Sequence, residues 1–203
     1  MVGDQKRYGG DLTVGSLLVR ESRIVARLLA SGEEPDTIKS EVMNRNLFQN
    51  NSPTTTRKYC QLIILRLEQL NPPQLRIVAE GTDESAALML MAAVLKNYPI
   101  VRNFVTDVLF DKVRCYEPSL DKKDWTRFLE QRETIYSEIK KWTESSRKKI
   151  GQVIFRMLSE AGLLSDTRRM LIQFPSIPFD VADSLLQSSD GRILECLKLG
   201  KVA

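Results

Sequence analysis

Apolar residues recur at every third or fourth position along most of the chain, and no other feature restricts its fold as strongly. In the helix that this spacing predicts over 14–29, apolar residues from Leu17 to Leu28 form one stripe, and charged residues lie between them. Only the segment Arg168–Phe174 (RRMLIQF), which Pro175 follows, has the composition of a strand. Because one strand cannot form an open sheet, the sequence predicts an all-α protein. We expect a compact multi-helix bundle with at most one short β strand or hairpin near 168–174.

Two breaks in the periodicity divide the chain. The Asn-Asn-Ser-Pro turn separates a helix predicted over 36–46 from a third helix, for which Ser52 is the predicted N-cap. Asn71-Pro72-Pro73 follow, and a proline disfavours helical backbone in the residue before it. We therefore predict an N-terminal helical subdomain, residues 1–71, with a helix-turn-helix-like segment, and a C-terminal helical subdomain, residues 72–203, with a basic helix and a candidate wing.

The composition argues against most classes of enzyme. The chain has no histidine, which excludes Ser-His-Asp triads, Cys-His dyads and every zinc site that uses histidine. Its three cysteines lie far apart, so we expect reduced thiols in a cytoplasmic protein. The Gly10–Gly15 spacing resembles a phosphate-binding loop, but Ser16-Leu17 replace the Lys and Ser/Thr that hold the phosphates and the metal. We predict a non-enzymatic protein with no cofactor, no metal and no small-molecule substrate.

The longest apolar run, Ala86–Leu95, is the only candidate for a membrane segment. It is much shorter than the roughly 18 residues that a membrane helix needs. We expect a buried core helix instead, and no membrane partner.

Positive charge is concentrated in two segments. Residues 42–67 contain no acidic residue, and residues 140–169 contain eight Lys or Arg against three Asp or Glu, a net of +5 in a chain whose total is +4. In both segments cations lie at the predicted start of a helix, where backbone N–H groups and the helix dipole favour anions. A nucleic-acid partner is therefore the first hypothesis.

Each basic segment has the order helix, short turn, basic helix. This is the layout of a helix-turn-helix, whose second helix enters the major groove, and the strand predicted after Gly162 would form a wing. The candidate DNA-binding residues are Thr54, Thr56, Arg57, Lys58, Ser146, Arg147, Lys148, Lys149, Arg168 and Arg169. If four to six phosphates are engaged, the logarithm of the binding constant should fall with the logarithm of salt concentration with a slope of roughly −4 to −5.

A second interpretation of the same charges stays open. Cations at a helix start oppose the helix dipole, and runs of charge commonly do no more than face solvent. The charge pattern alone does not decide between a solvated surface and a docking surface for a polyanion.

Several sequence blocks, taken in order, resemble the BrxA family. They are YGGDLTVGSLLVRESRIVARLL at 8–29, NLFQ-x-x-S from Asn46, Arg66-Leu67, and W-T-x-x-x-R-K-K…R-M-L-x-E-A-G-L-L from Trp142. Members are small accessory proteins of BREX, the bacteriophage exclusion systems of bacteria and archaea. The resemblance implies a mostly helical, non-enzymatic protein with a fold like that of the antitermination factor NusB. It also implies neighbouring genes for a methyltransferase, a phosphatase-like protein and a large ATPase, and it implies duplex DNA binding.

Charge placement and resemblance together predict a DNA-binding accessory protein of a BREX system. We expect it to contact double-stranded DNA mainly through phosphates, with RNA not excluded, and to have other BREX proteins as partners. The alternative is a protein–protein adaptor that assembles other BREX components without direct nucleic-acid binding.

Overall fold

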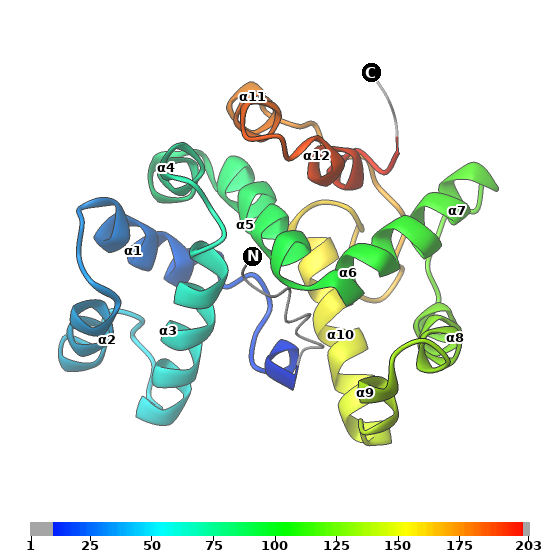
Figure 1. Ribbon diagram of the computed structural model, residues 1–203, viewed down its shortest axis with the longest axis horizontal. Coiled ribbons are helices and arrows are strands. Elements are labelled where there is room, and N and C mark those ends of the chain that lie inside the picture. The colour runs from blue at the N-terminus through cyan, green and yellow to red at the C-terminus, as the bar shows by residue number, and fades with distance from the viewer. Residues whose placement is uncertain (1–9, 201–203) are drawn as a thin grey trace.

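The computed structural model describes residues 10–200, and the regular structure in this range is helical (Figure 1). The all-α prediction is confirmed. In chain order the elements are η1 (Gly10–Thr13), α1 (Val19–Ala30), α2 (Pro35–Asn44), α3 (Pro53–Leu67), α4 (Pro72–Glu80), α5 (Asp83–Asn97), α6 (Pro99–Phe104), η2 (Val105–Leu109), α7 (Phe110–Arg114), α8 (Lys122–Glu133), α9 (Ser137–Lys140), α10 (Glu144–Glu160), α11 (Phe179–Gln187) and α12 (Gly191–Leu197).

The helix α5 is the centre of the bundle. Every residue from Ser85 to Leu95 is buried, because helices pack around the whole circumference of α5. Its neighbours are α1, α3, α4, α6, α10, α11 and α12. The prediction that the apolar run 86–95 is a buried core helix is confirmed. Within residues 10–200, no helix combines the length and the apolar content that crossing a bilayer requires.

An aromatic cluster joins α6, α8 and α10. The ring centroid of Phe104 lies 5.3 Å from that of Trp125, 5.3 Å from that of Phe128 and 6.1 Å from that of Phe155. The first two pairs are edge-to-face, a favourable arrangement for aromatic rings. This cluster fixes where α10 lies relative to α8.

The loop before α1 connects α3 with α10. The buried Arg66 of α3 donates hydrogen bonds to the carbonyl oxygens of Gly15 (3.1 Å) and Ser16 (2.5 Å). From the other side, Glu160 of α10 accepts hydrogen bonds from Ser16 Oγ and from the Leu17 backbone N–H, each 2.8 Å long. Arg66, a cation of the acid-free segment 42–67, is therefore a structural residue, and the loop 15–17 is bound by α3 and α10 together.

Three element boundaries differ from the predictions. Helix α1 begins at Val19 instead of residue 14, because Leu18 has a left-handed φ of 53° and the loop before it is held as described. Helix α2 ends at Asn44 and not at residue 46, since Asn46 also adopts a left-handed φ, of 46°. Both ends therefore depend on single backbone conformations that the apolar spacing does not encode.

The predicted strand at 168–174 is the third difference. Leu171 forms an isolated antiparallel bridge with Ser119, and Ile172 forms one with Leu164. Arg168 and Arg169 precede these bridges and lie in a turn, so they form no part of a strand. The segment 168–174 therefore forms two isolated bridges and no strand.

The domain boundary between residues 71 and 72 stays a prediction. Helix α1 packs extensively against α4 across it, and one buried apolar cluster runs through both sides. The outer ends of the two predicted subdomains, residues 1–9 and 201–203, lie outside the described residues.

Candidate nucleic-acid interface

The start of α3 presents hydroxyl and cationic side chains to solvent. Ser52 is the N-cap: its Oγ accepts a hydrogen bond from the Thr55 backbone N–H (3.3 Å), and Pro53 occupies the first helical position. Both were predicted from the sequence. Thr54, Arg57 and Lys58 are exposed, and among the described residues neither cation forms an ion pair. The geometry is suited to phosphate, since N–H groups and cations lie at the same helix end.

Thr56 differs from its neighbours. It is 3% exposed, and its Oγ1 donates a hydrogen bond to the Ser52 carbonyl oxygen (3.1 Å). The side chain points into the protein, so it is not available to a ligand at this helix start.

The start of α10 has the same kind of cap and a similar set of charges. Thr143 Oγ1 accepts a hydrogen bond from the Ser146 backbone N–H (3.2 Å). Lys148 and Lys149 are exposed, whereas Ser146 is half-buried. Two of the predicted cations are therefore accessible here.

Arg147, the third predicted cation at this start, is bound within the protein. Its guanidinium forms an ion pair with Glu133 at the end of α8. It also donates hydrogen bonds to the carbonyl oxygens of Ile139 and Trp142, each 3.1 Å long. Because these contacts occupy Nε, Nη1 and Nη2, Arg147 joins α8, α9 and α10 and is not available as a phosphate ligand.

Arg168 and Arg169 lie beyond the other end of α10. The Asp166 carboxylate accepts hydrogen bonds from the backbone N–H groups of Arg169 (2.7 Å) and Arg168 (2.6 Å), and these bonds lower the pKa of Asp166. Both arginine side chains remain exposed. Since α10 has 17 residues, a length of about 25 Å separates its basic start from the end that leads to this turn.

The predicted residues thus fall into three patches. In Figure 1, α3 and α10 both begin at the lower edge of the view and converge upward, and η1 lies between them. Helix η1 packs against α10. We name the exposed cations of these two starts, Arg57, Lys58, Lys148 and Lys149, the paired helix starts. The turn with Arg168 and Arg169 lies apart from them.

Neither basic segment has the dimensions of a helix-turn-helix. The loop 45–52 between α2 and α3 is longer than the turn of about 3–4 residues in that motif. Helix α9, which precedes α10, comprises only Ser137–Lys140. The cationic helix starts are present, but their partner helices differ from those of the motif.

Sequence reasoning missed a row of arginines on α1. Arg20, Arg23 and Arg27 line a hollow of about 860 Å³ together with Asp83 and Glu160. Arg23 forms an ion pair with Asp83, and Arg27 Nε donates to a backbone carbonyl oxygen of α4, 3.1 Å away. The spacing of three and four residues that places these arginines on one face was visible in the sequence, but the acidic groups opposite them were not.

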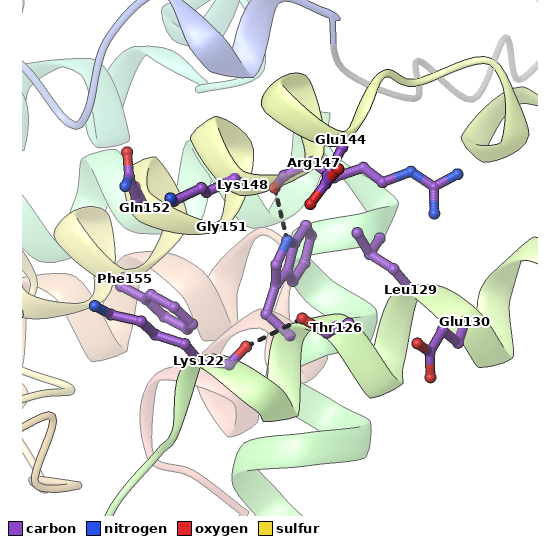
Figure 2. Close-up of a pocket in the computed structure, with 11 residues that line it drawn as sticks. Lys122, Thr126, Leu129, Glu130, Glu144, Arg147, Lys148, Gly151, Gln152 and Phe155 are labelled. Carbon is purple, nitrogen blue, oxygen red and sulfur yellow. Dashed lines mark hydrogen bonds between the residues drawn. The ribbon is translucent and has the colours of Figure 1, made fainter.

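A second missed feature is a cavity of about 340 Å³ between α8 and α10 (Figure 2). The indole Nε1 of Trp125 donates a hydrogen bond to the Arg147 carbonyl oxygen (2.9 Å). A Cβ atom on Gly151 would lie 2.5 Å from the Trp125 ring, so only glycine fits at this close approach of α8 and α10. The cavity is lined by Lys122, Trp125, Thr126, Leu129, Glu130, Glu144, Arg147, Lys148, Gly151, Gln152 and Phe155.

Residues 10–200 show no cluster suited to a metal ion, and the two buried thiols are not activated. The described residues contain no group of three or more His, Cys, Asp or Glu that could hold a metal ion. Burial raises the pKa of the Cys60 and Cys196 thiols to about 11, so both are protonated near neutral pH.

The family of this chain follows from comparison with known proteins. The model of the BrxA family matches residues 6–189. The chain belongs to the BrxA family. A curated relative, BREX protein BrxA of Escherichia coli strain HS, is 30% identical over 173 residues, which cover 85% of this chain and 81% of the relative. BREX protein BrxA of Paramagnetospirillum magneticum is 28% identical over 195 residues, with 96% and 98% covered.

The fold is also similar to a solved structure. A crystal structure of an uncharacterized protein from Magnetospirillum magneticum superposes with a TM-score of 0.86 at 26% identity, covering 95% of this chain and 99% of the other. This BrxA protein therefore shares its helical arrangement with that protein over nearly its whole length. The likeness to NusB stays a prediction.

Proposed function

We propose that this BrxA protein is a non-enzymatic accessory protein of a BREX phage-defence system that binds duplex DNA mainly through phosphates. The names of its curated relatives support the BREX context. The observation that carries the DNA-binding part is the pair of capped helix starts, each with two exposed cations, at one edge of the molecule (Figure 1). Backbone N–H groups and cations at a helix start favour phosphate oxygens.

The proposed contact set is smaller than the one predicted from sequence. Its cations are Arg57, Lys58, Lys148 and Lys149, and the exposed Thr54 and half-buried Ser146 supply hydroxyl groups. The buried Thr56 and the internally bound Arg147 are left out. Arg168 and Arg169 form a separate candidate contact, because they follow the opposite end of α10.

Binding through phosphates has a measurable signature. Four engaged cations give a slope of log K against log salt of about −4, with little dependence on base sequence. Fluorescence anisotropy with labelled duplexes of unrelated sequence, measured across a salt series, tests both statements. Absence of binding at about 50 mM salt, or binding that salt does not weaken, would contradict the proposal. The same titration with a duplex RNA decides between the two kinds of nucleic acid.

A second candidate, a protein–protein adaptor within the BREX system, is supported by exposed apolar side chains. Tyr116 is 94% exposed and, with Leu171 and Ile172, lines a hollow of about 490 Å³. On α11, Phe179 is 85% exposed. Large exposed apolar groups are typical of surfaces that bind other proteins.

One double variant separates the two candidates. Lys148→Glu/Lys149→Glu should weaken DNA binding by roughly tenfold or more and leave a complex with another BREX protein intact if DNA binding is the function of this surface. If the variant loses a BREX partner while DNA binding persists, the adaptor is favoured.

A further inference from the structure

The cavity between α8 and α10 has ammonium groups at one end and carboxylates at the other, where the guanidinium of Arg147 also lies, paired with Glu133 (Figure 2). In the view of Figure 2, Lys122, Lys148 and Gln152 lie toward the end where Phe155 is found, whereas Glu130 and Glu144 lie toward the other end. The ammonium groups and the carboxylates are therefore separated along the cavity. A complementary ligand carries an anion at one end and hydrogen-bond donors at the other.

The wall between these ends is apolar and aromatic. Trp125, Leu129 and Phe155 form it, and they are 4%, 2% and 5% exposed. The volume of about 340 Å³ is in the range of small-molecule sites, which is roughly 300–1,000 Å³. A ligand with an apolar middle would therefore displace water from this wall.

We propose that this cavity binds a nucleoside monophosphate unit whose base carries an exocyclic amino group. The ammonium groups of Lys122 and Lys148 bind the phosphate through charge-assisted hydrogen bonds. The base lies against the apolar wall, and its amino group donates to the carboxylate of Glu130 or Glu144. The site shares Lys148 with the paired helix starts, but its ligand is a single nucleotide, so its binding of dAMP does not depend on duplex binding.

Such a unit has two sources: a free nucleotide, or an unpaired nucleotide within a DNA strand. Lys148 lines the cavity and also belongs to the paired helix starts, so a strand bound at the start of α10 passes close to the cavity. The two sources share the same contacts, and the experiment distinguishes them.

The intrinsic fluorescence of Trp125 reports directly on ligand binding in this cavity. The chain has two tryptophans, Trp125 in the wall and Trp142 outside it, so a Trp142→Phe background leaves one reporter. Titration of the full chain with dAMP should give a saturable change in Trp125 emission. Deoxyadenosine, which lacks the phosphate, should bind at least about tenfold more weakly. Thymidine monophosphate, whose base has no amino group, should also bind more weakly than dAMP.

Variants test the assignment of the residues. Lys122→Ala/Lys148→Ala should weaken dAMP binding by about tenfold or more. Lys123→Ala/Lys140→Ala is the matched control, because it removes two positive charges at exposed positions that do not line the cavity. Thr126→Phe, on the exposed rim, should block binding by filling the cavity. Circular dichroism and thermal unfolding establish that each variant is folded.

A duplex with one bulged dA, compared with the same duplex fully paired, identifies the source. Tighter binding of the bulged duplex that Thr126→Phe removes assigns the site to an unpaired nucleotide in DNA. Saturable binding of dAMP with no preference for the bulge assigns it to a free nucleotide.

Three results would overturn the proposal. One is no change in Trp125 emission at millimolar dAMP, and another is binding of inorganic phosphate as tight as that of dAMP. The third is loss of a BREX protein partner, without any nucleotide binding, in Lys122→Ala/Lys148→Ala, which would make the cavity a protein docking site.

Discussion

The starts of α3 and α10 look alike in sequence and differ in structure. Both have a hydroxyl N-cap followed by serine or threonine and an arginine–lysine pair. In α3, Arg57 is exposed, whereas in α10 the corresponding Arg147 is bound by Glu133 and two backbone carbonyl oxygens. Similar cationic patterns therefore have different uses: one arginine remains available to a ligand and the other holds three helices together.

The difference should be greatest in stability. Arg147→Ala removes a half-buried ion pair and leaves Glu133 and two carbonyl groups without their partner, so we expect the free energy of unfolding to fall by about 2–3 kcal/mol. Arg57→Ala, the matched variant in α3, should change it by less than about 0.5 kcal/mol. Urea unfolding followed by circular dichroism measures both. An equal loss of unfolding free energy in the two variants would contradict the structural role assigned to Arg147.

The next largest effect concerns DNA affinity, which substitutions at the two helix starts should lower by similar amounts. Arg57→Glu/Lys58→Glu and Lys148→Glu/Lys149→Glu should each weaken duplex binding by roughly tenfold or more at about 50 mM salt, because each reverses two phosphate contacts. Anisotropy titrations measure the change. As a control with the same charge change, Arg76→Glu/Arg192→Glu alters exposed residues of α4 and α12. Should only one pair matter, the interface is confined to one helix.

The two N-caps offer a smaller and more symmetrical test. Ser52→Ala and Thr143→Ala each remove the side-chain oxygen that accepts a backbone N–H, at an expected cost of about 1 kcal/mol each. Thr54→Ala, at an exposed position in the same turn of α3, should have almost no effect. Thermal unfolding distinguishes these variants. A neutral Thr143→Ala would mean that the Arg147 contacts alone hold the start of α10.

The smallest effect is expected at the turn after α10. Arg168→Ala/Arg169→Ala should weaken duplex binding by less than about threefold and leave the salt slope almost unchanged. Lys148→Ala/Lys149→Ala, in contrast, should lower the magnitude of the salt slope by about 2. Salt-dependent anisotropy measures both quantities. A slope reduced equally by the two variants would extend the DNA contact along the full length of α10.

Local features of the fold were predictable from the sequence. The apolar run of α5 and the caps at Ser52 and Thr82 depend on residues close together in the chain. The burial of Thr56 could also have been inferred, because it lies four and seven residues before the buried Cys60 and Ile63 on the same face of α3.

Features that depend on distant partners were not predictable in this way. The sequence could not show that Arg147 is bound within the protein while Lys148 and Lys149 are exposed. That difference depends on Glu133 and on the carbonyl groups of Ile139 and Trp142, which face Arg147 in the fold. The cavity between α8 and α10 likewise depends on Gly151 meeting Trp125, a contact between helices that no spacing within either helix predicts.

The loop 15–17 joins α3 and α10 at the ends opposite to their cationic starts. Because Arg66 lies in the last turn of α3 and Glu160 is the last residue of α10, these hydrogen bonds fix the two helices where they converge and do not fix the distance between their starts. A polyanion that touches both starts must therefore span the gap between two helices that diverge toward their starts (Figure 1). Contacts at two separated points depend on how phosphates are spaced along the duplex and not on base edges, so unrelated duplexes should compete for this surface about equally.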